Sequence, residues 1–216
     1  MQRSNPVRRA AARVLVCCGA CTAAPAAHAL PLISELFYDA VGTDDGKSFV
    51  ELYGTPGASL DGLRLEVVNG ADGVVVTALT LSGVFPSSGL FVVADRTSAG
   101  VSNVAEANLL LEFDIQNGPD SLLLRSATEL LDAVGFGVFG ATEVFAGEGS
   151  PAVDVPAGAS LARLFANLDS GDNAVDFGEL ALPTPGSALF AAVPEPGVAS
   201  LCALGLAALA TRRRSR

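Results

Sequence analysis

Carboxylates are the side chains of this sequence that offer chemistry, and they gather in two places. The first group contains Asp39, Asp44 and Asp45 in one loop, with Glu35 and Glu51 on the segments that flank it. Two acids at a suitable separation can hydrolyse a glycosidic bond, one as proton donor and the other as nucleophile or base. Glu35 and Glu51 are therefore a candidate acid pair. The alternative for the loop aspartates is that their side chains form turns and face solvent.

The second group contains Asp169, Asp172 and Asp176, with Asn173 between them. Hard oxygen ligands at close spacing suit Ca²⁺, which takes about six to eight oxygens. The stretch is not an EF-hand loop, because Gly171 stands where that loop needs a ligand. Asp169, Asp172 and Asp176 are therefore candidate calcium ligands. The alternative is again that these side chains form turns in solvent.

Histidine and cysteine are absent from the middle of the chain. The single histidine is His28, and the four cysteines are Cys17, Cys18, Cys21 and Cys202. Residues 30–190 therefore exclude Ser-His-Asp and Cys-His catalysis and zinc sites with histidine or cysteine ligands. No glycine-rich loop precedes a helix, so a phosphate cradle is not expected either. We predict a protein that is not an enzyme and has no cofactor apart from the calcium considered above.

Charge is distributed very unevenly along the chain. Eight of the 13 basic residues lie in the first thirteen and the last five positions. The middle of the chain holds 22 acids against 5 bases, a net charge of −17. Those bases are Lys47, Arg64, Arg96, Arg125 and Arg163. A surface this acidic repels phosphate backbones, which argues against nucleic acid as a partner.

The middle segment is patterned as short strands. Leu63, Leu65 and Val67 alternate with charged residues, which is the period of a half-buried strand. Strands are predicted at 33–38, 49–53, 63–67, 74–81, 90–94, 109–113, 121–125 and 130–138, with Gly-containing turns such as Asn117-Gly118-Pro119 between them. No amphipathic helix of useful length is found. The pattern predicts an all-β fold of the sandwich type, with a looser chain from residue 141 onward.

The first 29 residues are typical of a secretory signal peptide. An arginine-bearing start precedes an apolar stretch from Val14 to Ala24, which is too short for the ~20 residues that span a bilayer. Pro25 interrupts a helix, and Ala27 and Ala29 supply the small side chains that a signal peptidase requires. We predict cleavage after Ala29. Two alternatives stay open: a retained anchor, and a lipoprotein acylated at Cys21.

The last 24 residues have three parts in a fixed order. Val193-Pro194-Glu195-Pro196 is stiff and extended, because each proline fixes its own φ and restrains the residue before it. Residues 197–211 are apolar, and 212–216 include Arg212, Arg213 and Arg214. A helix from 196 to 211 is about 24 Å long against a hydrocarbon core of about 30 Å, so a short transmembrane helix is predicted. Basic residues stay in the cytoplasm, which places the acidic body outside.

This order of a VPEP peptide, a short apolar helix and a terminal arginine cluster resembles the PEP-CTERM sorting signal of Gram-negative bacteria that make exopolysaccharide. The resemblance implies processing by an exosortase, a membrane protease that resembles a transpeptidase. The enzyme is expected to cut near Pro194-Glu195-Pro196 and release the body to the cell surface or exterior. The alternative is an ordinary tail anchor.

The body also resembles a known family. The stretch LISELFYDAVGTDDGKSFVELYGTPGASLDGLRL is similar to the opening of the lamin-tail domain. Later pieces follow in the order of the bacterial version: GLFVVAD, IQNGPDSLLL, LLDAVGFG, GEGSP and DSGDNAVDFGELALPTPGSA. Phe49 departs from the family at a position often held by Trp. The resemblance implies an immunoglobulin-like sandwich that is not known as a catalyst.

Three regions are therefore expected: a signal peptide at 1–29, a lamin-tail-like sandwich at 30–190 and a sorting signal at 193–216. We predict an exported, non-catalytic surface or matrix protein of a Gram-negative bacterium, first anchored in the inner membrane and then processed. Its expected partners are an exosortase-type protease and exopolysaccharide or surface proteins of a biofilm. The alternative is a calcium-dependent secreted hydrolase that uses carboxylates alone.

Overall fold

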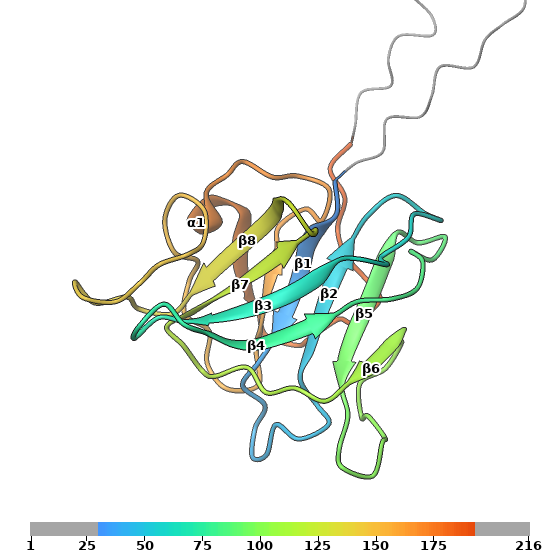
Figure 1. Cartoon of the computed structure of the whole chain (residues 1–216), viewed down its shortest axis with the longest axis horizontal. Helices are drawn as coiled ribbons and strands as arrows, with labels where there is room; N and C mark the ends of the chain where they lie inside the picture. The colour runs from blue at the N-terminus through green and yellow to red at the C-terminus, as the bar shows by residue number, and fades with distance from the viewer. Residues whose placement is uncertain (1–29, 193–216) are drawn as a thin grey trace, which may run out of the picture.

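The protein is an all-β sandwich of two sheets with almost no helix (Figure 1). The computed structural model describes residues 30–192. The predicted cleavage site and the predicted sorting signal, with its membrane helix, lie outside the described residues. Within 30–192, no helix has the length and apolar character needed to cross a membrane.

Ten strands and one short helix make up the described body. The six-stranded sheet has the order β10-β9-β1-β2-β5-β6, and the four-stranded sheet has the order β4-β3-β7-β8. The strands are β1 (Leu32–Phe37), β2 (Phe49–Tyr53), β3 (Arg64–Asn69), β4 (Val75–Thr80), β5 (Leu90–Asp95), β6 (Leu109–Leu111), β7 (Asp120–Arg125), β8 (Leu130–Phe136), β9 (Ser160–Arg163) and β10 (Phe177–Leu180). Helix α1 is Asn173–Asp176.

The core lies between the two sheets and follows the period-2 alternation of the strands. Leu65 and Val67 of β3 point into it, and Val50 and Leu52 of β2 meet them from the other sheet. The same alternation holds along β5, β7 and β8. All neighbouring strands are antiparallel except β5 and β6, which are parallel.

The strands predicted between residues 33 and 138 are all present, with small shifts of their ends. The expectation of a loose chain after residue 141 was wrong for β9 and β10, which extend the six-stranded sheet beyond β1. Neither strand shows a clear alternation over its four residues. They form because β9 pairs with β1, where Leu161 lies opposite Leu36, a contact between residues far apart in the sequence.

The outer face of the six-stranded sheet is covered by loops and by the end of the body. Phe37, Phe49, Val92 and Ala94 form a small second cluster there. Residues 181–192, which we call the strap, run across this side of the sheet after β10. The two ends of the described body leave the sandwich at the same end (Figure 1).

Candidate functional site

Glu35 and Glu51, the candidate acid pair, lie opposite each other on β1 and β2. A bulge between Ile33 and Glu35 lets both Ile33 and Leu36 enter the core while Glu35 faces outward. Glu35 is 2% exposed and Glu51 is fully buried. The structure therefore brings the pair together, as a catalytic dyad requires, but it places the pair beneath the strap.

Both carboxylates hold the strap in place. Glu35 accepts hydrogen bonds from the Thr184 backbone N–H at 2.9 Å and from the Thr184 hydroxyl at 3.0 Å. Glu51 accepts one from the Gly186 N–H at 2.7 Å. Gly186 has a φ of +84°, and a side chain there would meet Cβ of Glu106. On the sheet, the hydroxyls of Ser160 and Ser34 donate to Glu35 and Glu51, respectively.

Burial changes the protonation of Glu51. It raises the pKa of Glu51 to about 7, and the negative charge of Glu35 acts in the same direction. The Gly186 N–H and the Ser34 hydroxyl oppose the shift by stabilising the charged form. Strap backbone groups and serine hydroxyls bind both carboxylates, and Glu35 also borders a hollow of about 280 Å³ between β9, β10 and the strap. The pair is a docking point for the chain's own backbone.

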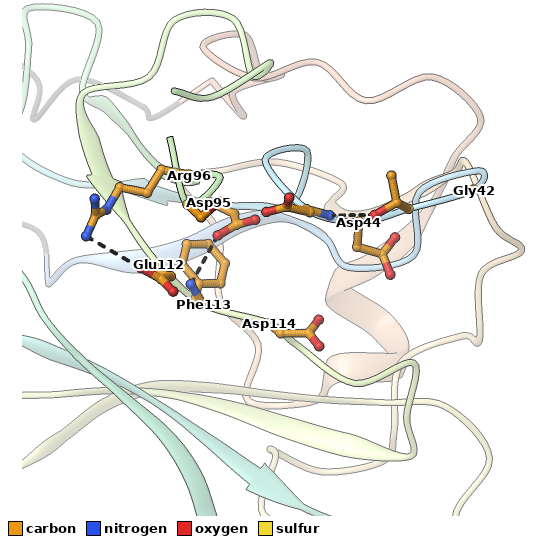
Figure 2. A pocket seen from close by; sticks show the side chains of 10 residues that line it. Gly42, Asp44, Asp95, Arg96, Glu112, Phe113 and Asp114 are labelled. Atoms are coloured by element: carbon orange, nitrogen blue, oxygen red, sulfur yellow. Dashed lines mark hydrogen bonds and ion pairs between the residues drawn. The ribbon is translucent and has the colours of Figure 1, made fainter. Parts of the chain in front are cut away.

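The first aspartate cluster lies beside a large open hollow of about 760 Å³ (Figure 2). The loop before β2 and the segments that follow β5 and β6 form its walls. Its lining residues are Gly42, Thr43, Asp44, Asp45, Asp95, Arg96, Ser98, Glu112, Phe113 and Asp114. Asp39 is not among them.

Carboxylates of two kinds face this hollow. Asp95 is buried and fixes the walls, since it accepts hydrogen bonds from the N–H groups of Gly46 at 2.6 Å and Phe113 at 3.1 Å. Asp45 and Asp114 are exposed. Arg96 is the single base in the lining, and its guanidinium lies 3.7 Å from the carboxylate of Glu112. The hollow can therefore accept hydrogen bonds or positive charge from a ligand.

The second aspartate cluster is divided among separate partners. Asp172 caps α1, accepting hydrogen bonds from the N–H groups of Ala174 and Ser150. Asp176 accepts from the Ser170 N–H and from Arg163. The carboxylate of Asp169 accepts from the Gly171 N–H at 3.0 Å. The structure thus gives each predicted calcium ligand a protein partner, and calcium at this cluster stays a prediction.

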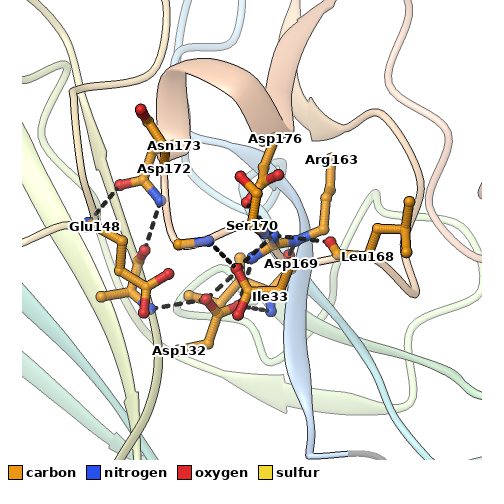
Figure 3. A network of polar contacts seen from close by, with 12 residues as sticks. Ile33, Asp132, Glu148, Arg163, Leu168, Asp169, Ser170, Asp172, Asn173 and Asp176 are labelled. Atoms are coloured by element: carbon orange, nitrogen blue, oxygen red, sulfur yellow. Dashed lines mark hydrogen bonds and ion pairs between the residues drawn. The ribbon is translucent and has the colours of Figure 1, made fainter.

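Arg163 is the centre of a buried polar network that was not predicted from the sequence (Figure 3). Its guanidinium donates to both carboxylate oxygens of Asp132, at 3.0 and 2.8 Å, and to Asp176 at 3.1 Å. It also donates to the Ile33 carbonyl and lies 4.5 Å above the ring of Phe177. Asp132 itself accepts the Ile33 N–H at 2.6 Å. The network joins β1 and β9 of one sheet to β8 of the other.

Three carboxylates of this region are close enough to share a cation. Asp132, Glu148 and Asp169 each offer an oxygen within 4.8 Å of the others. Glu148 has one buried oxygen, Oε2, without a hydrogen-bond partner among the described residues. Desolvation raises the pKa of Glu148 to about 7, and the charges of Asp132 and Asp169 add to the shift. Arg163 already supplies a positive charge to two of these carboxylates, Asp132 and Asp169.

A sequence signal for this network existed but was not decisive. Asp132 interrupts the apolar run of residues 130–136, and Arg163 is the lone base of its segment. Charges inside strands that are otherwise apolar need partners when they are buried. The sequence does not say which acid meets which base, and only the packing of β8 against β1 and β9 brings these two together.

Comparison with known proteins found no similar protein. No family model, no curated protein and no solved structure matches the chain.

Proposed function

We propose that this chain is an exported, non-catalytic surface or extracellular-matrix protein whose sandwich has a binding or structural role in an exopolysaccharide or biofilm setting. One observation carries the proposal. Glu35 and Glu51, the pair best placed for hydrolysis, are buried and hold the strap through its backbone N–H groups. A glycosidase dyad needs a sugar between its carboxyl groups, and here the chain's own backbone takes that place.

The strand order supports an immunoglobulin-like assignment within the all-β class. In that fold, strands A, B and E share one sheet, and C′, C, F and G lie side by side in the other. The order β1-β2-β5 corresponds to A, B and E, and β4-β3-β7-β8 corresponds to C′, C, F and G. The protein departs from the pattern by adding β9 and β10 beyond β1 and by placing β6 beside β5.

The pieces that resemble the lamin-tail domain fall on the structural framework. GLFVVAD covers β5, IQNGPDSLLL leads into β7, and LLDAVGFG covers β8. DSGDNAVDFGEL covers α1 and β10. A lamin-tail-like sandwich is therefore the finer assignment that we propose.

Export and sorting rest on the two ends of the chain. We propose removal of the signal peptide after Ala29 and recognition of Val193-Pro194-Glu195-Pro196 by an exosortase-type protease. The helix at 197–211 and Arg212, Arg213 and Arg214 would hold the precursor in the inner membrane until it is processed. The mature protein would then reside at the cell surface or outside the cell.

The hollow of Figure 2 is the binding surface that we assign to the sandwich. Its exposed acids accept hydrogen bonds, as the hydroxyl groups of a neutral glycan require, and they repel anionic polymers. A neutral exopolysaccharide is accordingly the ligand class that we favour over nucleic acid or anionic lipid.

Location and processing can be tested by mass spectrometry of the intact protein recovered from culture fluid and from membranes. The proposal requires an N-terminus at residue 30 and a C-terminus near 194–196 in the released form. A soluble cytosolic protein that retains both Met1 and Arg216 would overturn the proposal. A lipid adduct on Cys21 would replace signal peptide cleavage after Ala29 with a lipoprotein anchor.

Binding and hydrolysis can be separated with the polysaccharide of the producing cells. We expect the protein to co-sediment with it without releasing reducing ends. The double variant Asp45→Asn, Asp114→Asn should weaken co-sedimentation, whereas Asp154→Asn, an exposed change outside the hollow, should not. Release of reducing ends that is lost in Glu35→Gln would favour the alternative, a calcium-dependent hydrolase.

A further inference from the structure

Strand β4 (Val75–Thr80) is an open edge of the four-stranded sheet, and among the described strands it pairs with β3 alone. A sheet edge exposes backbone N–H and C=O groups that another strand can use. Proteins usually protect such edges with charges, prolines, short strands or covering segments. The edges of the two sheets differ in this protection.

The other edges are covered or short. At β8, the Asn173 side chain donates to the Ala133 carbonyl at 2.8 Å and accepts the Gly135 N–H at 2.9 Å. The Ala152 N–H donates to the Gly135 carbonyl at 2.8 Å. In the six-stranded sheet, the edge strands β6 and β10 have three and four residues. These edges offer little to a further strand.

The edge at β4 has no charge and no proline. From Gly73 to Ala94 the sequence contains no charged residue, in a body of net charge −17. Val74, Val75 and Val76 are 55%, 46% and 47% exposed. A register shift in the β3–β4 pair leaves Val76 without a partner residue on β3, but residues 77–80 pair regularly with β3. Four regular residues therefore remain on this edge.

The hydrogen-bond pattern identifies the backbone groups that are available. The Leu81 N–H donates to the Leu63 carbonyl, and hydrogen-bonded pairs alternate with non-hydrogen-bonded pairs along an antiparallel ladder. Leu79 and Thr77 therefore direct their backbone groups at β3. Ala78 and Thr80 direct theirs away from β3, toward the open edge, and both residues are exposed.

We propose that β4 pairs antiparallel with β4 of a second copy of this chain, with Ala78 opposite Ala78 on a two-fold axis. The two four-stranded sheets would then form one continuous sheet. The absence of charge at this edge, in an otherwise acidic body, favours a second copy of the chain as the partner. Two strongly acidic bodies repel each other least where the uncharged edge of one meets the uncharged edge of the other, whereas a basic partner would be drawn to the acidic surface. A two-fold interface uses the same surface of both subunits, and two identical antiparallel strands meet this condition.

The test uses sedimentation velocity of the full chain in a mild detergent over a wide range of concentration. The wild type should form dimers in a concentration-dependent manner. Ala78→Pro removes an N–H that points to the open edge and leaves the bonds to β3 intact. It should raise the dissociation constant at least about tenfold. Ala78→Lys places like charges across the two-fold axis and should have the same effect, whereas Val101→Lys, at a loop residue that is 58% exposed, should not.

Hydrogen exchange locates the interface independently. The N–H of Ala78 should gain protection as the protein dimerises, whereas the N–H of Leu79 should be protected at every concentration because it faces β3. Melting curves establish that both Ala78 variants are folded. If Ala78→Pro is unfolded, Ala78→Lys carries the test. The proposal would be overturned if the wild type stayed monomeric, even if its β4 edge bound unrelated extended peptides. It would also be overturned if the folded Ala78 variants still formed dimers.

Discussion

The Asn167 side chain and the Ala191 backbone exchange two hydrogen bonds, with the amide donating to the carbonyl at 3.0 Å and the N–H donating back at 2.8 Å. They fix the far end of the strap, next to Phe190, whose ring lies 5.4 Å from that of Tyr53. The strap is thus held at both ends, by Glu35 and Glu51 near Thr184 and by Asn167 near its last described residue. In the proposed precursor, the sorting peptide begins two residues beyond Ala191.

Removing the second of these attachments should loosen the strap while the sandwich stays folded. Asn167→Ala deletes both hydrogen bonds, each of which contributes about 1 kcal/mol. We expect faster hydrogen exchange and faster proteolysis between residues 184 and 191, with little change in the core strands. The control is Asn117→Ala, in the exposed turn before β7. Unchanged exchange in the strap of the Asn167 variant would contradict the assigned attachment.

Stability should rise as the pH falls from 8 toward 5. The pKa of Glu51 is about 7 in the folded protein, against 4.5 in the ordinary carboxyl group, so the folded state binds the proton more tightly than the unfolded chain. Its stabilisation is complete below about pH 4.5 and is lost as the pH rises through 7. The difference amounts to on the order of 3 kcal/mol.

Urea unfolding of the wild type and of Glu51→Gln across this pH range measures that effect. The amide can accept the Gly186 N–H and donate to the Ser34 hydroxyl without carrying a charge. The variant should therefore be at least as stable as the wild type at pH 8 and should depend less on pH. Glu148, whose pKa is also about 7, contributes in the same direction, so Glu148→Gln is the companion variant. Equal pH dependence in wild type and Glu51→Gln would contradict the role given to Glu51.

Arg163 should be the most sensitive base of the described body. Arg163→Met leaves Asp132 and Asp176 buried without their cation, and breaking a buried pair in this way costs about 3–5 kcal/mol. Arg163→Lys should not restore stability, because a single ammonium cannot reproduce the planar set of donors. Arg96→Met is the matched control, since its pair with Glu112 is exposed and contributes at most about 1 kcal/mol. Thermal unfolding of the three variants provides the comparison.

Calcium can be tested by mass action. Because Asp169, Asp172 and Asp176 are already hydrogen-bonded within the protein, we expect no rise in melting temperature between EDTA and submillimolar calcium. A rise that disappears in Asp172→Asn would establish the site predicted from the sequence. A rise that disappears in Glu148→Gln but persists in Asp172→Asn would instead place the ion among Asp132, Glu148 and Asp169.

Short apolar runs between turn residues, together with the alternation at 63–67, were enough to predict the strands from β1 to β8. Alternation also fixes the face of each side chain by its position along the strand. Residues 63–67 show this directly, with Leu65 and Val67 buried in the core as their spacing predicted. The same pattern failed for β9 and β10. Four residues contain too few alternations to identify a strand. Strand β9 forms by pairing with β1, more than a hundred positions earlier in the chain, and β10 then pairs with β9.

The sequence by itself also determined which kinds of chemistry the body can carry, since residue types do not depend on the fold: 22 acids, 5 bases, and neither histidine nor cysteine between residues 30 and 190. Tertiary structure alone decided what each acid does. A bulge in β1 aligns Glu35 with Glu51 beneath the strap, and the packing of β8 against β1 and β9 places Asp132 on Arg163. Both relationships depend on contacts between distant segments, because burial and charge pairing are properties of three-dimensional neighbours and not of sequence spacing.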